Sequence, residues 1–268
     1  MDGTLMGNDS CVSVAASCML NNLIEQHDVL FTVATARTPA TVVPLMSQVH
    51  STLPFIVMSG AALWNAATAC FEQVQVIPPD VVAATCRIAR KHGLHPFIYR
   101  RHGNFLHAYH GTCLSPAEQH FVDLRNHLPL KQFVIADGDL CAPADDALLI
   151  FMLNDYAVLE RAYEEIAATV PCSPQVYRDS CDPSVGLLEV YRQGCNKAAA
   201  IARLARSIGA DRVVAFGDNR NDIAMLQAAD VAIAVENAVP EVKAIAHTII
   251  GPNTTDAVPR YIAATIKQ

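Results

Sequence analysis

Several features that mark other classes of protein are missing from this 268-residue sequence. No run of Lys or Arg appears and the net charge is −7, so we expect no nucleic-acid-binding surface. The nine cysteines contain no C-x-x-C pair, which disfavours a zinc site. Their odd number and scattered positions are typical of buried thiols in a cytoplasmic protein rather than of a disulfide framework. No basic and then apolar signal pattern opens the sequence.

Charge is also missing from one long stretch, since residues 38–71 contain no Asp, Glu, Lys or Arg. A membrane-spanning helix would need about 20 consecutive apolar residues, but Pro39, Pro44, Pro54 and Gly60 interrupt the stretch. We therefore expect buried strand and helix pieces and no membrane segment. With 52% apolar and 17% charged residues, the chain is predicted to be compact and globular.

Short apolar runs alternate with helical patterns at both ends of the chain. Strands that read as continuous apolar runs, separated by helices, indicate a parallel sheet covered on both faces. The prediction is a doubly wound, Rossmann-like α/β core. The expected strands are 29–34, 54–58, 212–216, 231–235 and 248–251, and the expected helices are 38–50, 196–208, 222–229 and 239–246.

The middle of the chain follows a different pattern, with strands that look paired and half-exposed. Two of them, 95–100 and 104–110, flank a turn at 101–103, which predicts a hairpin. We expect an α+β insert at 78–189, which leaves 1–77 and 190–268 as the core. Arg100, Arg101 and His102 near the hairpin tip could contact a substrate or belong to a solvated loop.

Two carboxylates follow an apolar strand near the end of the chain. The segment Phe216-Gly217-Asp218-Asn219-Arg220-Asn221-Asp222 leads from that strand into a helix. This places Asp218 and Asp222 at the carboxyl edge of a sheet, where α/β folds bind ligands. Carboxylate oxygens at such an edge suit Mg²⁺. Taken alone, Asp218 could simply end a loop and Asp222 could cap the helix.

Three other segments could contribute to the same site. Asp2-Gly3-Thr4 is by itself more typical of a turn. Thr35 and Ala36 follow an expected strand, where a hydroxyl and free N–H groups can hold a phosphate, although Thr35 could be only a helix cap. Lys197 lies in the first turn of an expected helix and opposes its dipole, which hints at an anionic partner. A lone surface lysine is usually just solvated.

Taken in order, these four segments resemble the haloacid dehalogenase-like phosphatases, and more closely the Cof-type members, whose cap lies between the second and third motifs. Ser59-Gly60-Ala61 and the stretch 234–243 are similar to further parts of the family pattern. The resemblance covers nearly the whole chain. It implies a magnesium-dependent phosphatase in which 78–189 is a cap that selects the substrate.

The resemblance also implies a role for each site residue. Asp2 would be the general acid and base, and its carbonyl would bind Mg²⁺. Thr35 would hold the transferring phosphoryl group, with Ala36 beside it in the place of a family glycine. Lys197 would neutralise charge between the nucleophile and the phosphate. Asp218 would bind the metal directly and Asp222 would support it. Asn221 would contact the phosphate.

The family pattern differs from this sequence at its first motif, Asp-x-Asp-Gly-Thr. Met1 fills the middle position, so the nucleophilic Asp and its strand would precede Met1. Without them we expect two central strand edges to lack partners, at about 1–3 kcal/mol for each buried unpaired backbone group. We interpret Met1 as an internal methionine of a longer chain. A truncated, non-catalytic protein is the other interpretation.

The predicted function is hydrolysis of a small phosphate monoester, such as a sugar phosphate or a phosphorylated cofactor, through an aspartyl phosphate. A catalytically inactive protein that binds a ligand or regulates another process is the alternative. A phosphomutase, which would return the phosphoryl group to a sugar hydroxyl, is a third possibility. The expected partners are a small phosphorylated metabolite and Mg²⁺, and the sequence indicates no oligomeric state.

Overall fold

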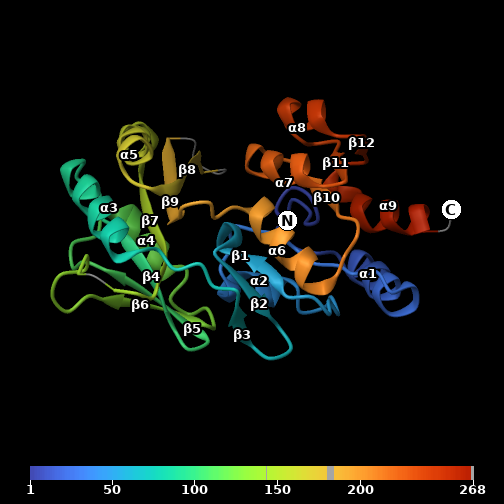
Figure 1. Cartoon of the computed structure of the whole chain (residues 1–268), viewed down its shortest axis with the longest axis horizontal. Helices are drawn as coiled ribbons and strands as arrows, with labels where there is room; N and C mark the ends of the chain where they lie inside the picture. Colours follow the sequence, from blue (N-terminus) through green and yellow to red (C-terminus); the bar gives the residue numbers. More distant parts are fainter. Residues whose placement is uncertain (143, 180–183, 267–268) are drawn as a thin grey trace. The chain divides into compact units, whose positions relative to one another are not determined.

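A computed structural model describes residues 1–142, 144–179 and 184–266 of the chain. The chain divides into two compact units (Figure 1). Unit 1 combines Met1–Ala69 with Asn196–Gln268, and unit 2 is the stretch Cys70–Cys195 between them. The sequence had placed this insert at 78–189. Within the described residues, no helix combines the length and the apolar character that crossing a membrane requires.

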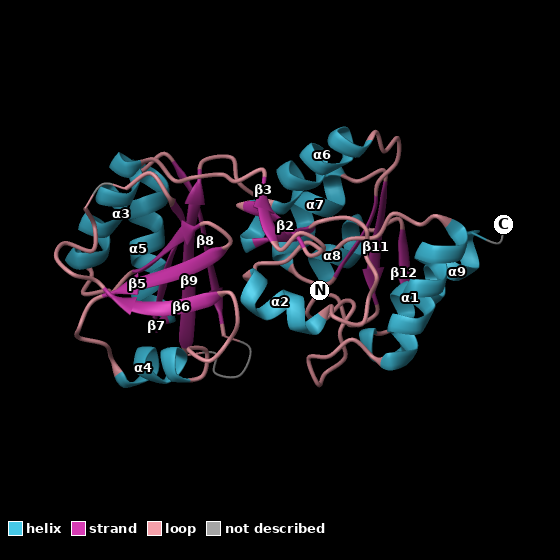
Figure 2. Cartoon of the chain, turned by 90° about the horizontal axis from the view of Figure 1, so that it is seen from below, coloured by secondary structure: helices cyan, strands magenta, loops and turns pink. Residues whose placement is uncertain are grey.

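Unit 1 is built on a parallel sheet with the strand order β10-β11-β12. Its central strand is buried and made of Val, Ile and Ala, as expected for a strand covered on both faces. Helices α1 and α9 lie side by side in this unit (Figures 1 and 2). The strands are β1 (Phe55–Val57), β2 (Ala62–Asn65), β10 (Val214–Gly217), β11 (Val231–Val235) and β12 (Thr248–Ile250). The helices are α1 (Val14–His27), α2 (Pro39–Leu45), α6 (Lys197–Ile208), α7 (Ile223–Ala228), α8 (Pro240–Ile245) and α9 (Ala257–Ile266), with 3-10 turns η1 (Met58–Gly60), η2 (Arg220–Asp222) and η3 (Asn253–Thr255).

A tight turn brings the β1–β2 hairpin against the start of α6. Strands β1 and β2 pair antiparallel, and η1 connects them. Gly60 in this turn has a φ of +98°, and a Cβ there would lie 2.5 Å from the carbonyl oxygen of Asn196. The carbonyl of Gly60 accepts a hydrogen bond from Arg203, further along α6, at 3.0 Å. A glycine is therefore required at position 60 for both its conformation and its close approach.

The strand expected at 29–34 does not form. Only Ala34 makes a β-bridge, to Ile56, so this segment has a strand-like partner on one side alone. Strand β10 is likewise at the end of its sheet, where β11 is its single partner among the described strands. The prediction was wrong because a strand is stabilised by its neighbours, and this segment lacks a second one.

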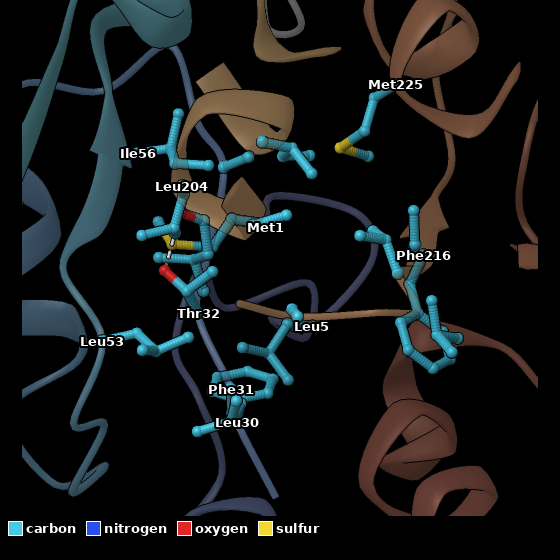
Figure 3. Close-up of a pocket in the computed structure, with 18 of the residues that line it drawn as sticks. Met1, Leu5, Leu30, Phe31, Thr32, Leu53, Ile56, Leu204, Phe216 and Met225 are labelled. Atoms are coloured by element: carbon cyan, nitrogen blue, oxygen red, sulfur yellow. Dashed lines mark hydrogen bonds between the residues drawn. The ribbon is translucent and has the colours of Figure 1, made fainter. Parts of the chain in front are cut away.

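An apolar cavity of about 220 Å³ is lined both by the segment at 29–34 and by β10. Figure 3 shows Ile56 and Leu204 pointing into it from one side and Phe216 and Met225 from the other. The sequence predicted two strand edges without partners at this position. In the structure, β10 and the segment 29–34, which forms no strand, both line this apolar slot.

Unit 2 is a six-stranded sheet with the order β6-β5-β4-β7-β9-β8. All neighbouring strands run antiparallel except β5 and β6, which are parallel. One face of the sheet carries Ile98 and Ile150 into a core shared with α3 and α5. The alternate residues Phe97 and Phe151 point to the opposite face, where Phe121 of α4 meets both rings. The strands of this sheet are β4 (Phe97–His102), β5 (Phe105–His110), β6 (Lys131–Ile135), β7 (Ala147–Asp155), β8 (Cys172–Arg178) and β9 (Val185–Arg192), and the helices are α3 (Pro79–Lys91), α4 (Pro116–Asp123) and α5 (Tyr156–Thr169). The short strand β3 (Cys70–Glu72) lies outside this sheet.

The cysteines depart from the expectation of scattered buried thiols. Cys86 of α3 and Cys141 form a disulfide inside unit 2. Cys11, Cys18 and Cys113 are exposed. The remaining thiols that the structure describes are half-buried or buried, and Cys181 lies outside the described residues. Sequence spacing gave no sign of the disulfide because its two halves are 55 residues apart and meet only in the folded sheet and helix.

Replacement of Gly60 tests the close contact between the hairpin turn and α6. Gly60→Ala should destabilise unit 1 by about 2 kcal/mol or more, because it adds a backbone clash to the strain of a positive φ. Gly209→Ala is the matched control: Gly209 has a φ of +66° and nothing within 4 Å of an added Cβ. It should cost only about 1 kcal/mol. Hydrogen exchange of the α6 amides under urea would measure the loss of unfolding free energy in each variant. Equal losses in Gly60→Ala and Gly209→Ala would contradict the close contact at Gly60.

Candidate active site

The charges of four predicted site residues act on the amino group of Met1. Burial lowers the pKa of this amino group, and the charge of Lys197 lowers it further. The carboxylates of Asp222, Asp218 and Asp2 act in the opposite direction. Hydrogen bonds link three of these residues, Lys197, Asp222 and Asp218, in unit 1.

A buried ion pair joins the start of α6 to the turn after β10. Lys197 Nζ donates to Asp222 Oδ1 at 2.7 Å, and both side chains are less than a tenth exposed. Burial alone would raise the pKa of Asp222, but the charge of Lys197 outweighs it and holds that pKa below its usual range. The other carboxylate oxygen accepts from the N–H groups of Asp218 and Asn219 at 3.2 and 3.4 Å. Asp222 thus fixes both the lysine and the backbone of the Asp218 turn.

Asp218 follows β10 directly and is held by the N-terminal loop. Thr4 Oγ1 donates to Asp218 Oδ1 at 2.5 Å. A Cβ at Gly3, whose φ is +66°, would lie 2.4 Å from Asp218 Oδ2, so only glycine fits there. The Gly3 carbonyl accepts from Asn237 Nδ2 at 2.7 Å. Burial, and then the charge of Asp222, raise the pKa of Asp218 above its usual range.

Asp2 is paired with a cation to which the sequence analysis gave no role. The Arg37 guanidinium donates to both carboxylate oxygens of Asp2, at 2.9 Å from Nε to Oδ2 and at a shorter distance from Nη2 to Oδ1. Burial would raise the pKa of Asp2, but the hydrogen bond and the charge of Arg37 lower it below its usual range. Arg37 is the only Lys or Arg in the first 86 residues, which is a signal that could have identified it.

Thr35 is buried beside this pair, but it makes no recorded contact with the lysine or the other carboxylates. Its hydroxyl accepts from the backbone N–H of Arg37 at 3.1 Å. The backbone N–H of Thr35 donates a hydrogen bond to the carbonyl of Ile56 at 2.9 Å. The N–H of Ala36 has no partner among the described residues. Arg37 therefore joins Thr35 and Asp2, and the structure adds no further contact between Thr35 and the group around Lys197.

Asn221 lies in η2 between the two aspartates, and its side chain is exposed. No hydrogen bond of this side chain is found among the residues that the structure describes. It is therefore positioned at the surface of the turn, where a ligand could reach it.

The carboxylates do not by themselves form a metal site. In the described part of the chain, no three His, Cys, Asp or Glu side chains are grouped so that they could hold a metal ion. The carboxylates of Asp2 and Asp222 are paired with Arg37 and Lys197, although the metal contact predicted for Asp2 is its backbone carbonyl. Only Asp218 has no cationic side chain hydrogen-bonded to its carboxylate. A Mg²⁺ site would need at least one more anionic ligand than these residues supply.

Comparison with known proteins assigns the family. The family model of haloacid dehalogenase-like hydrolases matches residues 1–262. A phosphatase of 5-amino-6-(5-phospho-D-ribitylamino)uracil, YitU of Bacillus subtilis, is 22% identical over 98% of this chain and 94% of its own length. The HMP-PP phosphatase of Serratia proteamaculans is 26% identical over 98% and 92%. Over a shorter stretch, 28% of each chain, the pyridoxal phosphate phosphatase YbhA of Escherichia coli is 42% identical.

Solved structures share the fold. A haloacid dehalogenase-like hydrolase from Bacteroides thetaiotaomicron superposes with a TM-score of 0.79 at 24% identity, over 98% of this chain and 96% of the other. The sugar phosphatase BT4131, of subclass IIB, gives a TM-score of 0.72 at 18% identity, over 99% and 96%. The predicted α/β fold and the predicted family are both confirmed. The chain belongs to the haloacid dehalogenase-like hydrolases and, within them, to the phosphatases.

Proposed function

We propose that this protein hydrolyses a small phosphate monoester, a sugar phosphate or a phosphorylated cofactor, through an aspartyl-phosphate intermediate. The observation that carries the proposal is the hydrogen-bonded group of Lys197, Asp222 and Asp218 in unit 1, in which Asp218 also accepts from Thr4 of the loop that contains Asp2. Relatives that span the whole chain are phosphatases of small phosphorylated molecules, which supports this substrate class.

The nucleophile of this reaction would be an Asp carried by a strand that leads into Met1. The apolar slot supports this proposal, because β10 borders it at the end of its sheet, the segment 29–34 with its bridge to Ile56 borders it as well, and its lining is apolar on both sides. An extended apolar segment would satisfy both edges and fill the cavity. Met1 and Thr4 line the same slot, so a strand in it could continue directly into the site.

The side chains that are present could then perform the remaining steps. Phosphoryl transfer depends mainly on alignment and on stabilisation of charge. Lys197 would neutralise charge between the nucleophile and the phosphoryl group, and Thr35, Ala36 and Asn221 would bind the phosphoryl oxygens. Asp2 would donate a proton to the leaving oxygen, and this requires that Arg37 release its carboxylate.

Mg²⁺ is the proposed cofactor and would supply further charge neutralisation when bound. Asp218 is the side chain best suited to bind it, since its carboxylate is half-buried and its only side-chain hydrogen bond comes from the neutral hydroxyl of Thr4. Asp222 would support the site through the Asp218 backbone, and the carbonyl of Asp2 and the proposed nucleophile would complete the oxygen donors. We further propose that unit 2 is the cap that selects the substrate, and that the protein acts in the cytoplasm.

A second candidate function is ligand binding without catalysis. It is favoured by the pairing of Asp2 with Arg37 and by the incomplete set of metal ligands. In this form the protein would bind a small anion beside Lys197 and Asn221. It would not turn the ligand over.

An activity comparison separates the two candidates. A chain extended by the in-frame codons upstream of Met1 should release phosphate from p-nitrophenyl phosphate with Mg²⁺. Its rate should exceed that of the chain starting at Met1 by about a thousandfold or more, because loss of a nucleophile has effects of that order. The extended chain with Lys197→Met is the control for background phosphatase. Equal rates for all three proteins, or an in-frame stop directly upstream of Met1, would favour the binding function.

The buried ion pair can be tested by stability as well as by activity. Lys197→Met should lower the free energy of unfolding of unit 1 by about 3 kcal/mol, because it leaves Asp222 charged and buried without its cation. Lys197→Met combined with Asp222→Asn should recover part of that loss, since the unpaired charge is gone. Urea unfolding of the two variants measures this. If the double variant instead lost as much unfolding free energy as the two single changes together, the losses would be additive. Additive losses would contradict a coupled pair.

The Arg37–Asp2 pair predicts a pH dependence with a definite sign. Because the folded pKa of Asp2 is lowered, the pair stabilises the fold above the unfolded pKa of about 3.9, and this is lost as the pH falls through the folded pKa. The contribution should stay below about 1 kcal/mol, since Asp2 is half-exposed. Arg37→Met should raise the pKa of Asp2 in carboxyl-carbon NMR. Arg220→Met, which breaks the exposed pair with Glu241, should leave it unchanged.

A further inference from the structure

Two asparagine side chains hold the N-terminal loop of unit 1 by its backbone carbonyls. Asn237, just after β11, donates from Nδ2 to the carbonyl of Gly3 at 2.7 Å. Asn253, just after β12, donates from Nδ2 to the carbonyl of Met6 at 2.7 Å and is itself buried. Both lie at the carboxyl ends of parallel strands, which is the sheet edge where α/β folds place their sites.

The segments at this edge are also hydrogen-bonded to one another. The backbone N–H of Asn253 donates to Asn237 Oδ1 at 2.9 Å, which joins the segment after β12 to the segment after β11. The N–H of Val239 donates to the carbonyl of Asp218 at 2.9 Å, which joins the segment after β11 to the turn after β10. Asp218 in turn accepts from the hydroxyl of Thr4. The loop is therefore held at three points by three connected segments.

The chemistry of an amide explains the residue type at position 237. A side-chain amide has both N–H donors and a carbonyl acceptor, so Asn237 can donate to Gly3 and accept from Asn253 at the same time. An ionised aspartate could only accept, and a lysine could only donate. Because an amide is neutral, it also holds the loop without adding a charge to the ion pairs of the site.

We propose that Asn237 is a positioning residue that sets where the loop presents Asp2 and Thr4 to the site. Asp2 directly precedes the carbonyl of Gly3 that Asn237 holds. Thr4, whose hydroxyl binds the turn after β10, directly follows it. A displaced Gly3 would therefore move both neighbours. The effect on catalysis rests on the proposed hydrolysis, whereas the placement of the loop does not.

A purely structural role for Asn237 has different consequences. Its side-chain oxygen could serve only to join the segments after β11 and β12, through the N–H of Asn253. In that case, loss of the N–H donor at position 237 would have no effect on the loop. Asn237→Asp separates the two roles, because a carboxylate keeps the acceptor for Asn253 and lacks the donor to Gly3.

Amide hydrogen exchange of the chain starting at Met1 tests the placement of the loop. The N–H groups of Leu5 and Met6 donate to the carbonyl of Met1 at 3.0 and 3.1 Å, so their protection reports whether the loop keeps its turn. Asn237→Asp should speed exchange at Leu5 and Met6 by about fivefold to tenfold, which is the effect of one lost hydrogen bond. The amides of β11 should keep their exchange rates, because the change is local.

Asn21 provides the matched control. Its Nδ2 donates to the carbonyl of Gln48 at 2.9 Å, and its Oδ1 accepts from the backbone N–H of His50 at 2.8 Å. The same pair of bonds is thus made in the same unit, away from the loop. Asn21→Asp should leave the exchange of Leu5 and Met6 unchanged.

Kinetics of the N-terminally extended chain test the effect on catalysis. With p-nitrophenyl phosphate, Asn237→Asp should lower kcat by about tenfold or more and change KM by less than about twofold, because the loop is misplaced while substrate binding is kept. Asn237→Ala, which adds no charge, should lower kcat to a similar extent, and Asn21→Asp should change neither constant. If the extended chain without substitutions is inactive, the proposed hydrolysis fails, and the exchange experiment alone decides whether Asn237 places the loop.

Two results would overturn the proposal. One is exchange at Leu5 and Met6 that Asn237→Asp leaves unaltered, or speeds no more than it speeds exchange in β11. The other is an active extended chain in which Asn237→Asp and Asn237→Ala have the kcat of the unsubstituted protein.

Discussion

The ion pair between Lys197 and Asp222 is the contact on which the rest of the site depends. It joins two segments that are 25 residues apart, and Asp222 also holds the backbone N–H groups of Asp218 and Asn219. Asp218 in turn accepts from Thr4, whose loop begins the chain. Because Lys197, Asp222 and Thr4 are buried and each is hydrogen-bonded within this chain of contacts, they restrict how the turn after β10, the start of α6 and the N-terminal loop can be arranged. Gly60 and Gly3 permit the close approaches that this arrangement requires.

The same site contains two features that do not suit catalysis as they stand. Asp2 is held by Arg37, and a lowered pKa makes its carboxyl a poor proton donor near neutral pH. Asp218 is the only predicted metal ligand whose carboxylate is not taken by a cation. Under the proposed function, an aspartate on a strand in the apolar slot would add an anion beside Lys197 and Asp218.

Most of unit 1 could be predicted from the sequence because its strands are continuous apolar runs. The strand at 231–235 and the helix after Asn196 were located to within a residue. The strand at 29–34 failed because pairing depends on a neighbour, and local composition does not report whether that neighbour is present. The helix expected at 38–50 ends at Leu45, directly after Pro44. The long helices α1 and α9 were missed, although both are amphipathic and pack together.

The order of the sequence motifs identified most of the charged residues of the site. Which of them form ion pairs is seen only in the structure. The role of Arg37 was missed because its partner, Asp2, is 35 residues away. The central claim is that a carboxylate in the slot becomes phosphorylated. The most direct test is acid quenching of the N-terminally extended chain after incubation with ³²P-labelled acetyl phosphate. The account predicts a hydroxylamine-labile phosphate on the peptide that includes Met1 and the residues before it. Label that is absent, or that is equally present on the chain starting at Met1, would contradict it.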